Sequence, residues 1–372
     1  MHPEDSITNI LLKQDPALHG IANRVLHHER ISVTEGLQLF SAPLGLLAFL
    51  ASFRNNHLQG KQVFYVRNFH IEPTNTCAYH CLFCSYSGVA GLRESWEHPP
   101  EVIQQMVEQS DPKAVEIHIT GGAHPRWRLE DYCRMIEMVR LLRPSIHIKA
   151  FSAVEIHHMH LTSGKSYGEV LTALKLAGLN SLPGGGAEIF AGEIREKICP
   201  EKANADQWLG VHRSAHGIGL PSNATMLYGH IETYAHRIDH LERLRSLQDE
   251  THGFNAFIPL KFRNTNNNMS DLPEVSVVED MKNYAVSRIF LDNFPHLKAY
   301  WPMLGKQSAG LSLEFGVDDL DGTIQDSTKI YTMAGVDETP SLSSAEMQHL
   351  IKQAGKVPVE RDALYRPVNI VE

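Results

Sequence analysis

The pattern of hydrophobic and polar positions changes near residue 62. Before that point it is helical: Ser32 and Glu35 form a capping box, and Leu44, Leu47 and Ala48 recur at helical spacing. After it, short apolar runs rich in β-branched and aromatic residues alternate with helical stretches. This alternation predicts parallel strands joined by crossover helices, and therefore an α/β chain.

The apolar runs predict at least six strands, at Phe69–Thr74, Ala114–Thr120, Ile146–Ser152, Ser181–Leu182, Ser222–Leu227 and Asn255–Leu260. Helices are predicted at Pro100–Gln109, Leu129–Leu142, Tyr167–Ala177, Asp206–Ile218, Tyr234–Glu250, Val277–Asp292 and Ser344–Ala354. The helix that begins at Tyr167 carries its own boundary signals, a capping box of Ser166 with Glu169 and a closing Gly178.

Glycine-rich turns follow several of these strands, at Gly121-Gly122, Gly184–Gly186 and Gly229. They place adaptable backbone at the carboxyl edge of the sheet, where barrels of alternating strand and helix build their active sites. We therefore expect a partial or complete (β/α) TIM-like barrel over residues 63–300. An N-terminal helical lead-in, residues 1–62, would precede it, and a C-terminal extension, residues 301–372, would pack on it.

Composition and charge exclude several classes of protein. The 372 residues are 42% hydrophobic and 21% charged, as in ordinary globular chains, and the net charge of −9 disfavours a nucleic-acid partner. The longest apolar stretch, Pro43–Phe53, has about half the roughly 20 residues needed to cross a bilayer, so no membrane partner is expected. Met1–Pro16 lacks the order of a signal peptide, and five cysteines do not resemble a disulfide framework. We expect the protein in the cytoplasm.

Three cysteines, Cys77, Cys81 and Cys84, form a C-x3-C-x2-C motif after the first predicted strand. Random scatter would give this spacing about one time in a thousand, and three thiolates in so short a loop can hold a metal. Zinc would normally need a fourth ligand in a structural site, for which His80 is awkwardly placed within the loop. A four-iron cluster held by three cysteines would leave one iron open to a substrate or cofactor. The cluster is favoured, and the alternative is zinc, which would make the chain a zinc-stabilised binding protein without catalytic activity.

The triplet, with Phe83 directly before its last cysteine, resembles the signature of the radical S-adenosylmethionine (SAM) enzymes. The resemblance implies a [4Fe-4S] cluster on Cys77, Cys81 and Cys84, whose open iron chelates the amino and carboxylate groups of SAM. One electron would cleave the sulfonium to methionine and a 5′-deoxyadenosyl radical. This chemistry implies a low-potential electron donor such as flavodoxin or ferredoxin.

The same resemblance suggests further cofactor-binding residues. The backbone of Gly121 and Gly122 would bind the methionine amino group, although a tight turn alone could explain the pair. Glu155 would contact the ribose unless it is a solvated loop carboxylate. The glycine run before Glu188 lacks the lysine of a P-loop and suits close backbone approach to a flat ligand, to which Glu188 would be a polar contact. Arg213 would face a cofactor carboxylate, or is an exposed helical arginine.

Other cysteines and histidines fit structural roles better. Cys133 lies at helical spacing among apolar residues and is expected to be a buried core thiol, and Cys199 is expected to be structural. His157, His158 and His160 do not form the HExxH pattern of a zinc helix and are expected in a mixed loop.

Longer stretches carry a closer resemblance. NTCAYHCLFCSYSG, HIKAFSAVEI, LPGGGAEIF, NATMLYGHIETYAHRIDHL, LQDETHGFNAFIPL and the late DGTI and KIY are similar to the aminofutalosine synthase family of the menaquinone pathway, over nearly the whole chain. Some motifs are shared with sister enzymes, the dehypoxanthine futalosine cyclase and the deazaflavin-forming synthase. The chain departs from the family pattern at Thr332, where histidine is expected, and in the turn Arg126-Trp127-Arg128.

The resemblance implies a transferase acting on a small molecule, 3-[(1-carboxyvinyl)oxy]benzoate. The deoxyadenosyl radical would add to the enol double bond. Aryl migration and loss of the carboxylate, as bicarbonate or carbon dioxide, would then give 6-amino-6-deoxyfutalosine. The dianionic substrate calls for cationic or amide donors at the barrel mouth. Lys261 and Arg263 are candidates, although surface charge explains each of them more simply.

Overall fold

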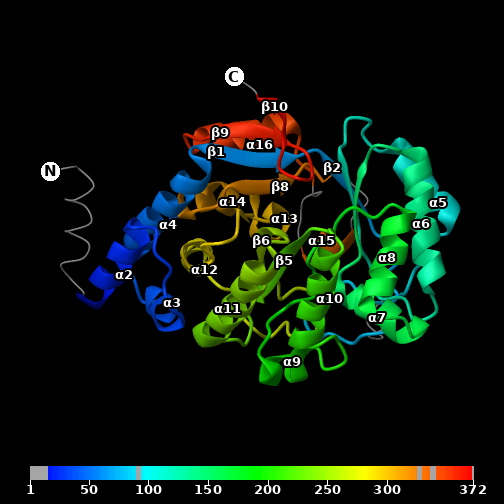
Figure 1. Cartoon of the computed structure of the whole chain (residues 1–372), viewed down its shortest axis with the longest axis horizontal. Coiled ribbons are helices and arrows are strands. Elements are labelled where there is room, and N and C mark those ends of the chain that lie inside the picture. Colours follow the sequence, from blue (N-terminus) through cyan, green and yellow to red (C-terminus); the bar gives the residue numbers. More distant parts are fainter. Residues whose placement is uncertain (1–15, 89–93, 325–328, 336–340, 371–372) are drawn as a thin grey trace.

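The computed structural model describes residues 16–88, 94–324, 329–335 and 341–370 (Figure 1). The chain in these ranges begins with the helices α2 (Pro16–Leu26), α3 (Val33–Leu39) and α4 (Leu44–Gln59). Ser32 and Glu35 cap α3 reciprocally, as their spacing predicts. Residues 1–15, on which most of the signal-peptide expectation rests, lie outside the described residues.

The strands of the described ranges follow in the order β1 (Gln62–Val66), β2 (Asn68–Ile71), β3 (Glu116–Ile119), β4 (His147–Ala150), β5 (Ser222–Tyr228), β6 (Phe254–Lys261), β7 (His296–Leu297), β8 (Asp319–Gly322), β9 (Val357–Arg361) and β10 (Pro367–Ile370). The helices among and after them are α5 (Pro100–Gln109), α6 (Leu129–Leu142), α7 (Ala153–Ser163), α8 (Tyr167–Ala177), α9 (Gly192–Ile198), α10 (Ala205–Gly217), α11 (Tyr234–Thr251), α12 (Val277–Phe290), α13 (Trp301–Leu304), α14 (Lys306–Ser312), α15 (Lys329–Met333) and α16 (Ser344–Gln353).

Parallel pairings join the strands into a ring. β2 pairs with β3, and β3 pairs with β4. Single parallel bridges at Ser181 and Leu182 link β4 to β5, which pairs with β6, and β6 with β7. A bridge at Lys298 leads to β8, and β8 pairs with β1, the strand that runs directly into β2. The fold is therefore the expected (β/α) TIM-like barrel.

The C-terminal part contributes to this barrel. β8 lies beyond residue 300, so the barrel extends past the boundary expected there. β9 pairs with β1 on the edge away from β8, and β10 pairs antiparallel with β9. Figure 1 shows these late strands beside the early strand β1. None of the helices in the described ranges is long and apolar enough to cross a bilayer.

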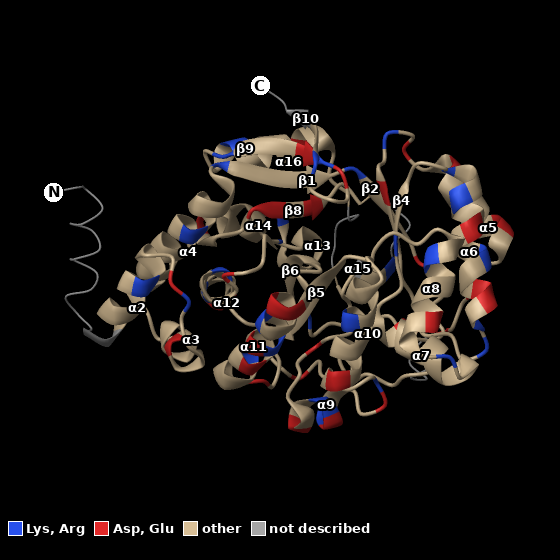
Figure 2. Cartoon of the chain, viewed as in Figure 1, with Lys and Arg blue, Asp and Glu red and all other residues tan. Residues whose placement is uncertain are grey.

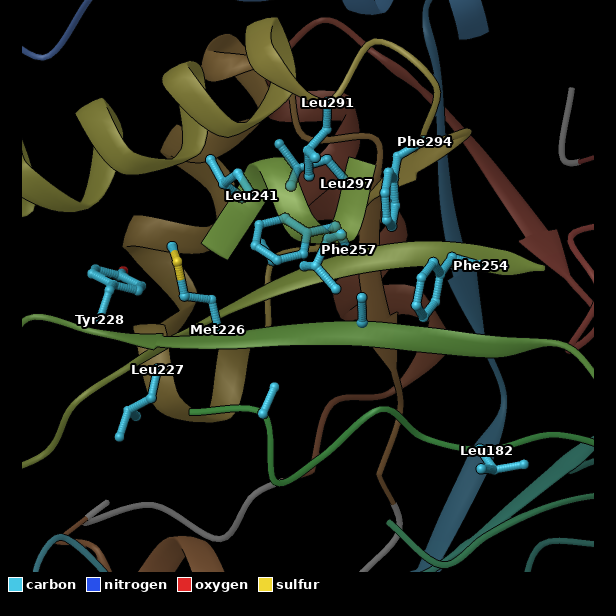
Figure 3. Close-up of a cluster of buried hydrophobic side chains, with 14 of the residues drawn as sticks. Leu182, Met226, Leu227, Tyr228, Leu241, Phe254, Phe257, Leu291, Phe294 and Leu297 are labelled. Carbon is cyan, nitrogen blue, oxygen red and sulfur yellow. The ribbon is translucent and has the colours of Figure 1, made fainter. Parts of the chain in front are cut away.

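Successive side chains along a strand point alternately to the outer apolar core and to the interior of the barrel. On β5, Met226 is fully buried and belongs to the main apolar core. Figure 3 shows Phe257 and Leu241 on one side of β5 and Leu227 on the other. Leu227 lines the cavity inside the barrel. The helices thus pack on the outward positions and leave the inward positions to form a site.

Most predicted elements are present with their expected bounds, but two stretches differ. The Ser181–Leu182 run makes only single-residue bridges. His157, His158 and His160 lie on the helix α7, so the prediction of a mixed loop there is wrong. These polar side chains are partly or largely buried. The helix therefore lacks the usual spacing of buried apolar and exposed polar residues by which a surface helix is recognised in a sequence.

Candidate active site

A cavity of about 360 Å3 opens at the carboxyl ends of the strands. Its lining includes all the expected cofactor and metal residues except Arg213, namely Cys77, Cys81, Phe83, Cys84, Gly121, Gly122, Glu155 and Glu188. They come from segments that follow β2, β3, β4 and the Ser181–Leu182 bridge. The barrel therefore gathers residues that are far apart in sequence at its active edge.

Backbone hydrogen bonds hold the cysteine loop in place. The N–H of Ala78 donates to the carbonyl of Ala123 at 2.9 Å, and the N–H of Leu82 donates to the carbonyl of Ile198 at 2.8 Å. The N–H of Ser87 donates to Cys84 Sγ at 3.4 Å. The loop is thus fastened to the turn after β3 and to the end of α9.

The donor set fits an iron–sulfur cluster. The thiols of Cys77, Cys81 and Cys84 are free and face one cavity. Burial raises the pKa of Cys77, and backbone N–H groups of Tyr79 and Ala123 act in the opposite direction by favouring the thiolate. Soft sulfur ligands that accept N–H bonds are characteristic of such clusters. In the described ranges no three of the Cys, His, Asp and Glu side chains are arranged to hold a single metal ion, so the fit rests on the chemistry of the three free thiols and on the cavity that they share.

The glycine pair packs tightly on the segment that leads into the cysteine loop. A Cβ atom on Gly121 would lie 2.7 Å from the carbonyl oxygen of Thr74, and one on Gly122 would lie 2.2 Å from that of Thr76. The N–H of Gly122 donates to the Thr74 carbonyl at 2.9 Å. Glycine is therefore required at both positions by close backbone approach, whatever ligand binds there.

Glu155 lies in the first turn of α7, where it forms a capping box with Ser152. Its side chain is buried, with 3% of the residue exposed, so it is not a solvated loop carboxylate. Burial raises the pKa of Glu155 to about 7, and hydrogen bonds from Ser152 oppose that shift. The cavity wall thus contains an acid that titrates near neutral pH.

Glu188 forms an ion pair with Lys202, and both side chains are nearly buried. The ammonium group of Lys202 also lies 5.4 Å from the centre of the Phe83 ring. These three residues form one wall of the cavity beside Cys81. Lys202 belongs to no recognisable motif, so sequence reasoning missed it.

Arg213 lies outside the cavity lining. It projects from α10, half-exposed, and its guanidinium donates to both carboxylate oxygens of Glu250 at 2.7 and 2.9 Å. The expectation that it faces a cofactor is therefore wrong, and the exposed helical arginine is what the structure shows. The helix turns this position away from the barrel.

The two cationic candidates near the mouth are already paired. Lys261 is buried, and its Nζ lies 2.8 Å from Asp280 Oδ2, so the simpler explanation of surface charge is wrong for this residue. Arg263 pairs with Glu274 at 3.2 Å and is partly exposed. Both line the cavity.

Several cavity residues were not expected from the sequence. The hydroxyl of Tyr86 donates to the Thr74 carbonyl at 3.0 Å, and His70 and His118 line the interior. Glu72 is buried at the start of the segment that leads into the cysteine loop. Its position two residues after His70 follows the period-two alternation of a strand, which could have indicated inward-facing residues.

Glu72 also ties the C-terminal part to the site. Its carboxylate accepts hydrogen bonds from the main-chain N–H groups of Lys329 at 2.8 Å and Ile330 at 3.2 Å. This contact holds α15 at the cavity, where Ile330 and Ala334 join the lining. Thr332, which departs from the family pattern, is an exposed residue of α15.

The remaining sequence candidates lie outside the cavity lining. Cys199 is buried, whereas Cys133 is only partly buried on α6 and packs against the core. His80 is exposed and pairs with Glu201. In the Arg126-Trp127-Arg128 turn, the indole N–H of Trp127 donates to Glu97 at 3.0 Å.

Comparison with known proteins assigns this arrangement to a family. A family model of the Radical SAM superfamily matches residues 71–244, and a model of the CofH/MqnC C-terminal region matches residues 251–372. Aminodeoxyfutalosine synthase of Thermus thermophilus is 42% identical over 363 residues, 96% of this chain and 97% of that protein. The chain is a radical SAM enzyme of the CofH/MqnC family. Radical SAM enzymes use a [4Fe-4S] cluster and SAM, and this chain carries the Cys77, Cys81 and Cys84 motif.

Other members of this radical SAM family are also similar. Aminodeoxyfutalosine synthase of Streptomyces coelicolor is 37% identical over 93% of this chain and 92% of that protein. The 5-amino-6-(D-ribitylamino)uracil–L-tyrosine 4-hydroxyphenyl transferase of Methanopyrus kandleri is 36% identical over 84% of this chain and 86% of that protein. Among solved structures, HydG, a maturase of the [FeFe]-hydrogenase, matches with a TM-score of 0.74 at 16% identity over 97% of this chain and 81% of that one.

Proposed function

We propose that this radical SAM enzyme is an aminodeoxyfutalosine synthase of menaquinone biosynthesis. Its substrates would be SAM and 3-[(1-carboxyvinyl)oxy]benzoate, and its products 6-amino-6-deoxyfutalosine, methionine and bicarbonate or carbon dioxide. The observation that carries the proposal is the 42% identity to the Thermus thermophilus synthase over 96% of this chain. The cavity adds support, because the candidate cluster ligands and space for a small molecule occur together.

Cys77, Cys81 and Cys84 would hold the [4Fe-4S] cluster through three irons and leave the fourth open to SAM. When bound and reduced, the cluster supplies the electron that splits the sulfonium bond of SAM. We expect this electron to come from a low-potential donor such as flavodoxin or ferredoxin. Phe83, Gly121 and Gly122 lie beside the cysteines and would position the methionine part.

The other cavity residues would position the nucleoside and exclude water. Glu155, buried on the wall, would contact the ribose, and the ion pair of Glu188 with Lys202 would help to exclude water beside Cys81. The hydroxyl of Tyr86 is engaged by the Thr74 carbonyl, so its hydrogen is not directed at a reacting carbon. A primary carbon radical takes hydrogen from misplaced neighbours, so this positioning is the main contribution of the protein.

The second candidate is the 4-hydroxyphenyl transferase activity of the Methanopyrus kandleri relative. The 36% identity to that protein over 84% of this chain is close to the value for the synthases. The name of that enzyme gives its substrates as a ribitylaminouracil and L-tyrosine, so the two candidates differ in the charge of the molecule that the cavity accepts.

The proposal is tested by product analysis. Anaerobically reconstituted and reduced protein is incubated with SAM and either 3-[(1-carboxyvinyl)oxy]benzoate or the ribitylaminouracil with L-tyrosine. Mass spectrometry should find an adenosylated, decarboxylated product from the benzoate and no coupled product from the second pair. SAM cleavage without an adenosylated product, or coupling of the second pair, would contradict the assignment.

A further inference from the structure

Two histidines meet at the inner end of the cavity. His70 on β2 and His118 on β3 are direct register partners, and their ring centres lie 4.6 Å apart at an angle of 71°. Both line the cavity. They precede the carboxyl ends of their strands, whereas the cysteine loop follows the end of β2. The histidines and the cysteines therefore occupy different depths of the same cavity.

His118 has unused hydrogen-bonding capacity. Among the described residues, no group forms a hydrogen bond to either of its ring nitrogens, and Nε2 is also sealed from solvent. The residue as a whole is partly exposed inside the barrel, so Nδ1 is the ring nitrogen that a ligand can reach. A lone pair on the sealed Nε2 and a proton on Nδ1 give the less costly tautomer, because an unpaired buried acceptor is better tolerated than an unpaired donor.

His70 is oriented by its neighbour Asn68. The side-chain oxygen of Asn68 accepts the N–H of Ile324 at 3.0 Å, which turns the amide nitrogen toward His70 Nε2 at 3.4 Å. This network assigns the lone pair of His70 to Nε2. The edge-to-face contact with His70 then fixes the plane of the His118 ring.

The charged groups around the histidines are already paired. Lys149 on β4 binds Glu116 on β3 at 2.7 Å, and Lys298 binds Asp321 on β8 at 2.7 Å. Figure 2 shows the acidic colouring of β8 among the strands, in addition to the charged positions on the helices. Burial lowers the pKa of His70 to about 4 and that of His118 well below its usual range, so both imidazoles are neutral at neutral pH.

The cations of the upper cavity are engaged as well. Lys202 pairs with Glu188, Lys261 with Asp280, and Arg263 with Glu274. An anionic group placed deep in the cavity would therefore meet a neutral N–H donor before any uncommitted cation among the described residues. His118 is the group with a free donor at that depth.

We propose that His118, held in place by His70, hydrogen-bonds the ring carboxylate of an aryl acid substrate through Nδ1–H. The inference rests on the proposed function, and it assigns the orientation of that substrate. The enol double bond must lie toward the cysteines, where the adenosyl group is generated. The ring carboxylate, at the other end of the molecule, then reaches the inner end of the cavity.

The test compares two ligands on the reconstituted holoenzyme with SAM and without reductant, so that no turnover occurs. The first is 3-[(1-carboxyvinyl)oxy]benzoate, and the second is 2-phenoxyacrylate, the same enol ether without the ring carboxylate. Dissociation constants are measured by anaerobic calorimetry. The wild-type protein should bind the diacid about tenfold more tightly, as a hydrogen bond to a charged group implies. Equal affinity for the two ligands would overturn the inference without any variant.

Variants then locate the donor. His118→Leu should lose about tenfold in affinity for the diacid and none for the monoacid, whereas His118→Asn, whose amide nitrogen mimics Nδ1, should restore most of the difference. The matched control, His349→Leu on the exposed side of α16, should change neither affinity. Equal losses for both ligands in His118→Leu would show a purely structural role and reject the inference.

The outcomes also separate this inference from the proposed function. If the wild-type protein converts the diacid but His118→Leu still binds the diacid more tightly than the monoacid to the same extent, the proposed function is supported and the role of His118 is rejected. If the wild-type protein binds neither acid and forms no adenosylated product, the proposed function fails and the inference fails with it.

Discussion

Ser152 and Glu155 cap the first turn of α7 reciprocally. The N–H and hydroxyl of Ser152 donate to Glu155 Oε2 at 2.7 and 2.8 Å, and the N–H of Glu155 donates to Ser152 Oγ at 3.3 Å. These bonds favour the carboxylate, yet burial on the cavity wall outweighs them and raises the pKa of Glu155 to about 7. One residue thus starts a helix and places a weak acid in the site.

The pH dependence of stability should report this burial. The folded pKa of about 7 exceeds the ordinary value of 4.5, so Glu155 favours folding below pH 4.5, and this contribution is lost as pH rises to about 7. Glu155→Gln removes the titration. The unfolding free energies of both proteins are measured by urea denaturation. The value for the variant minus the value for the wild-type protein should increase by roughly 3 kcal/mol as pH rises across this range.

Glu169→Gln is the matched control, because Glu169 forms the same capping box with Ser166 on the exposed start of α8. There the hydrogen bonds from Ser166 lower the pKa of the carboxyl, so the variant should not gain on the wild-type protein as pH rises. A constant difference between Glu155→Gln and the wild-type protein at all pH values would contradict the burial argument.

Gly122→Ala should displace the cysteine loop. The new methyl group would lie 2.2 Å from the Thr76 carbonyl oxygen, and neither backbone segment can yield without moving Cys77. We expect a loss of about 1–3 kcal/mol in unfolding free energy and a lower iron content after reconstitution. Gly168→Ala, on α8 with no atom within 4 Å of its new methyl group, should instead gain roughly 0.5–1 kcal/mol. Full iron content in Gly122→Ala would argue against the close approach.

The cysteine roles can be separated by iron analysis. Cys77→Ala, Cys81→Ala and Cys84→Ala should each fail to assemble the cluster, as measured by iron content and visible absorbance. Cys199→Ala is a sharp control, because Cys199 is buried directly after Ile198, whose carbonyl holds the cysteine loop. It should retain iron, and so should Cys133→Ala. Iron loss in Cys199→Ala would point to a ligand set other than the triplet.

Arg213→Ala should leave SAM binding unchanged. Its ion pair with Glu250 is about half exposed on the surface and contributes at most about 1 kcal/mol. Lys202→Met is the contrasting variant, since it would leave the nearly buried Glu188 unpaired and cost about 3–5 kcal/mol. Urea denaturation and equilibrium dialysis with SAM measure both effects. Weaker SAM binding in Arg213→Ala would restore the role expected from its sequence position.

The sequence predicts those elements whose signals are local. Ser166, Glu169 and Gly178 define the ends of α8, and the bounds match because caps act within a few residues. β8 was missed because its sequence, DLDG, resembles a turn. Its aspartates are stabilised inside the barrel by ion pairs with distant residues, Arg361 for Asp319 and Lys298 for Asp321.

In the site, too, residues with a local sequence signal were predicted and residues brought together by the fold were not. The cysteine triplet is a local motif, and the structure places all three residues on one cavity. Lys202, His118 and Glu72 carry no local signal, because their significance comes from the barrel that brings them to the cavity. Arg213 was misplaced for the complementary reason: a helical position near a glycine-rich loop in sequence turned out to face away from it.

The bond between Glu72 and α15 bears on how specificity can diverge in this family. Glu72 begins the segment that leads into the cysteine loop, whereas Ile330 and Ala334, which line the same cavity, belong to a segment near the C-terminal end of the chain. Mutations in that late segment can reshape the accepted molecule and leave the iron-binding loop untouched. Paralogues with different substrates could thus arise from one ancestral barrel while preserving its radical chemistry.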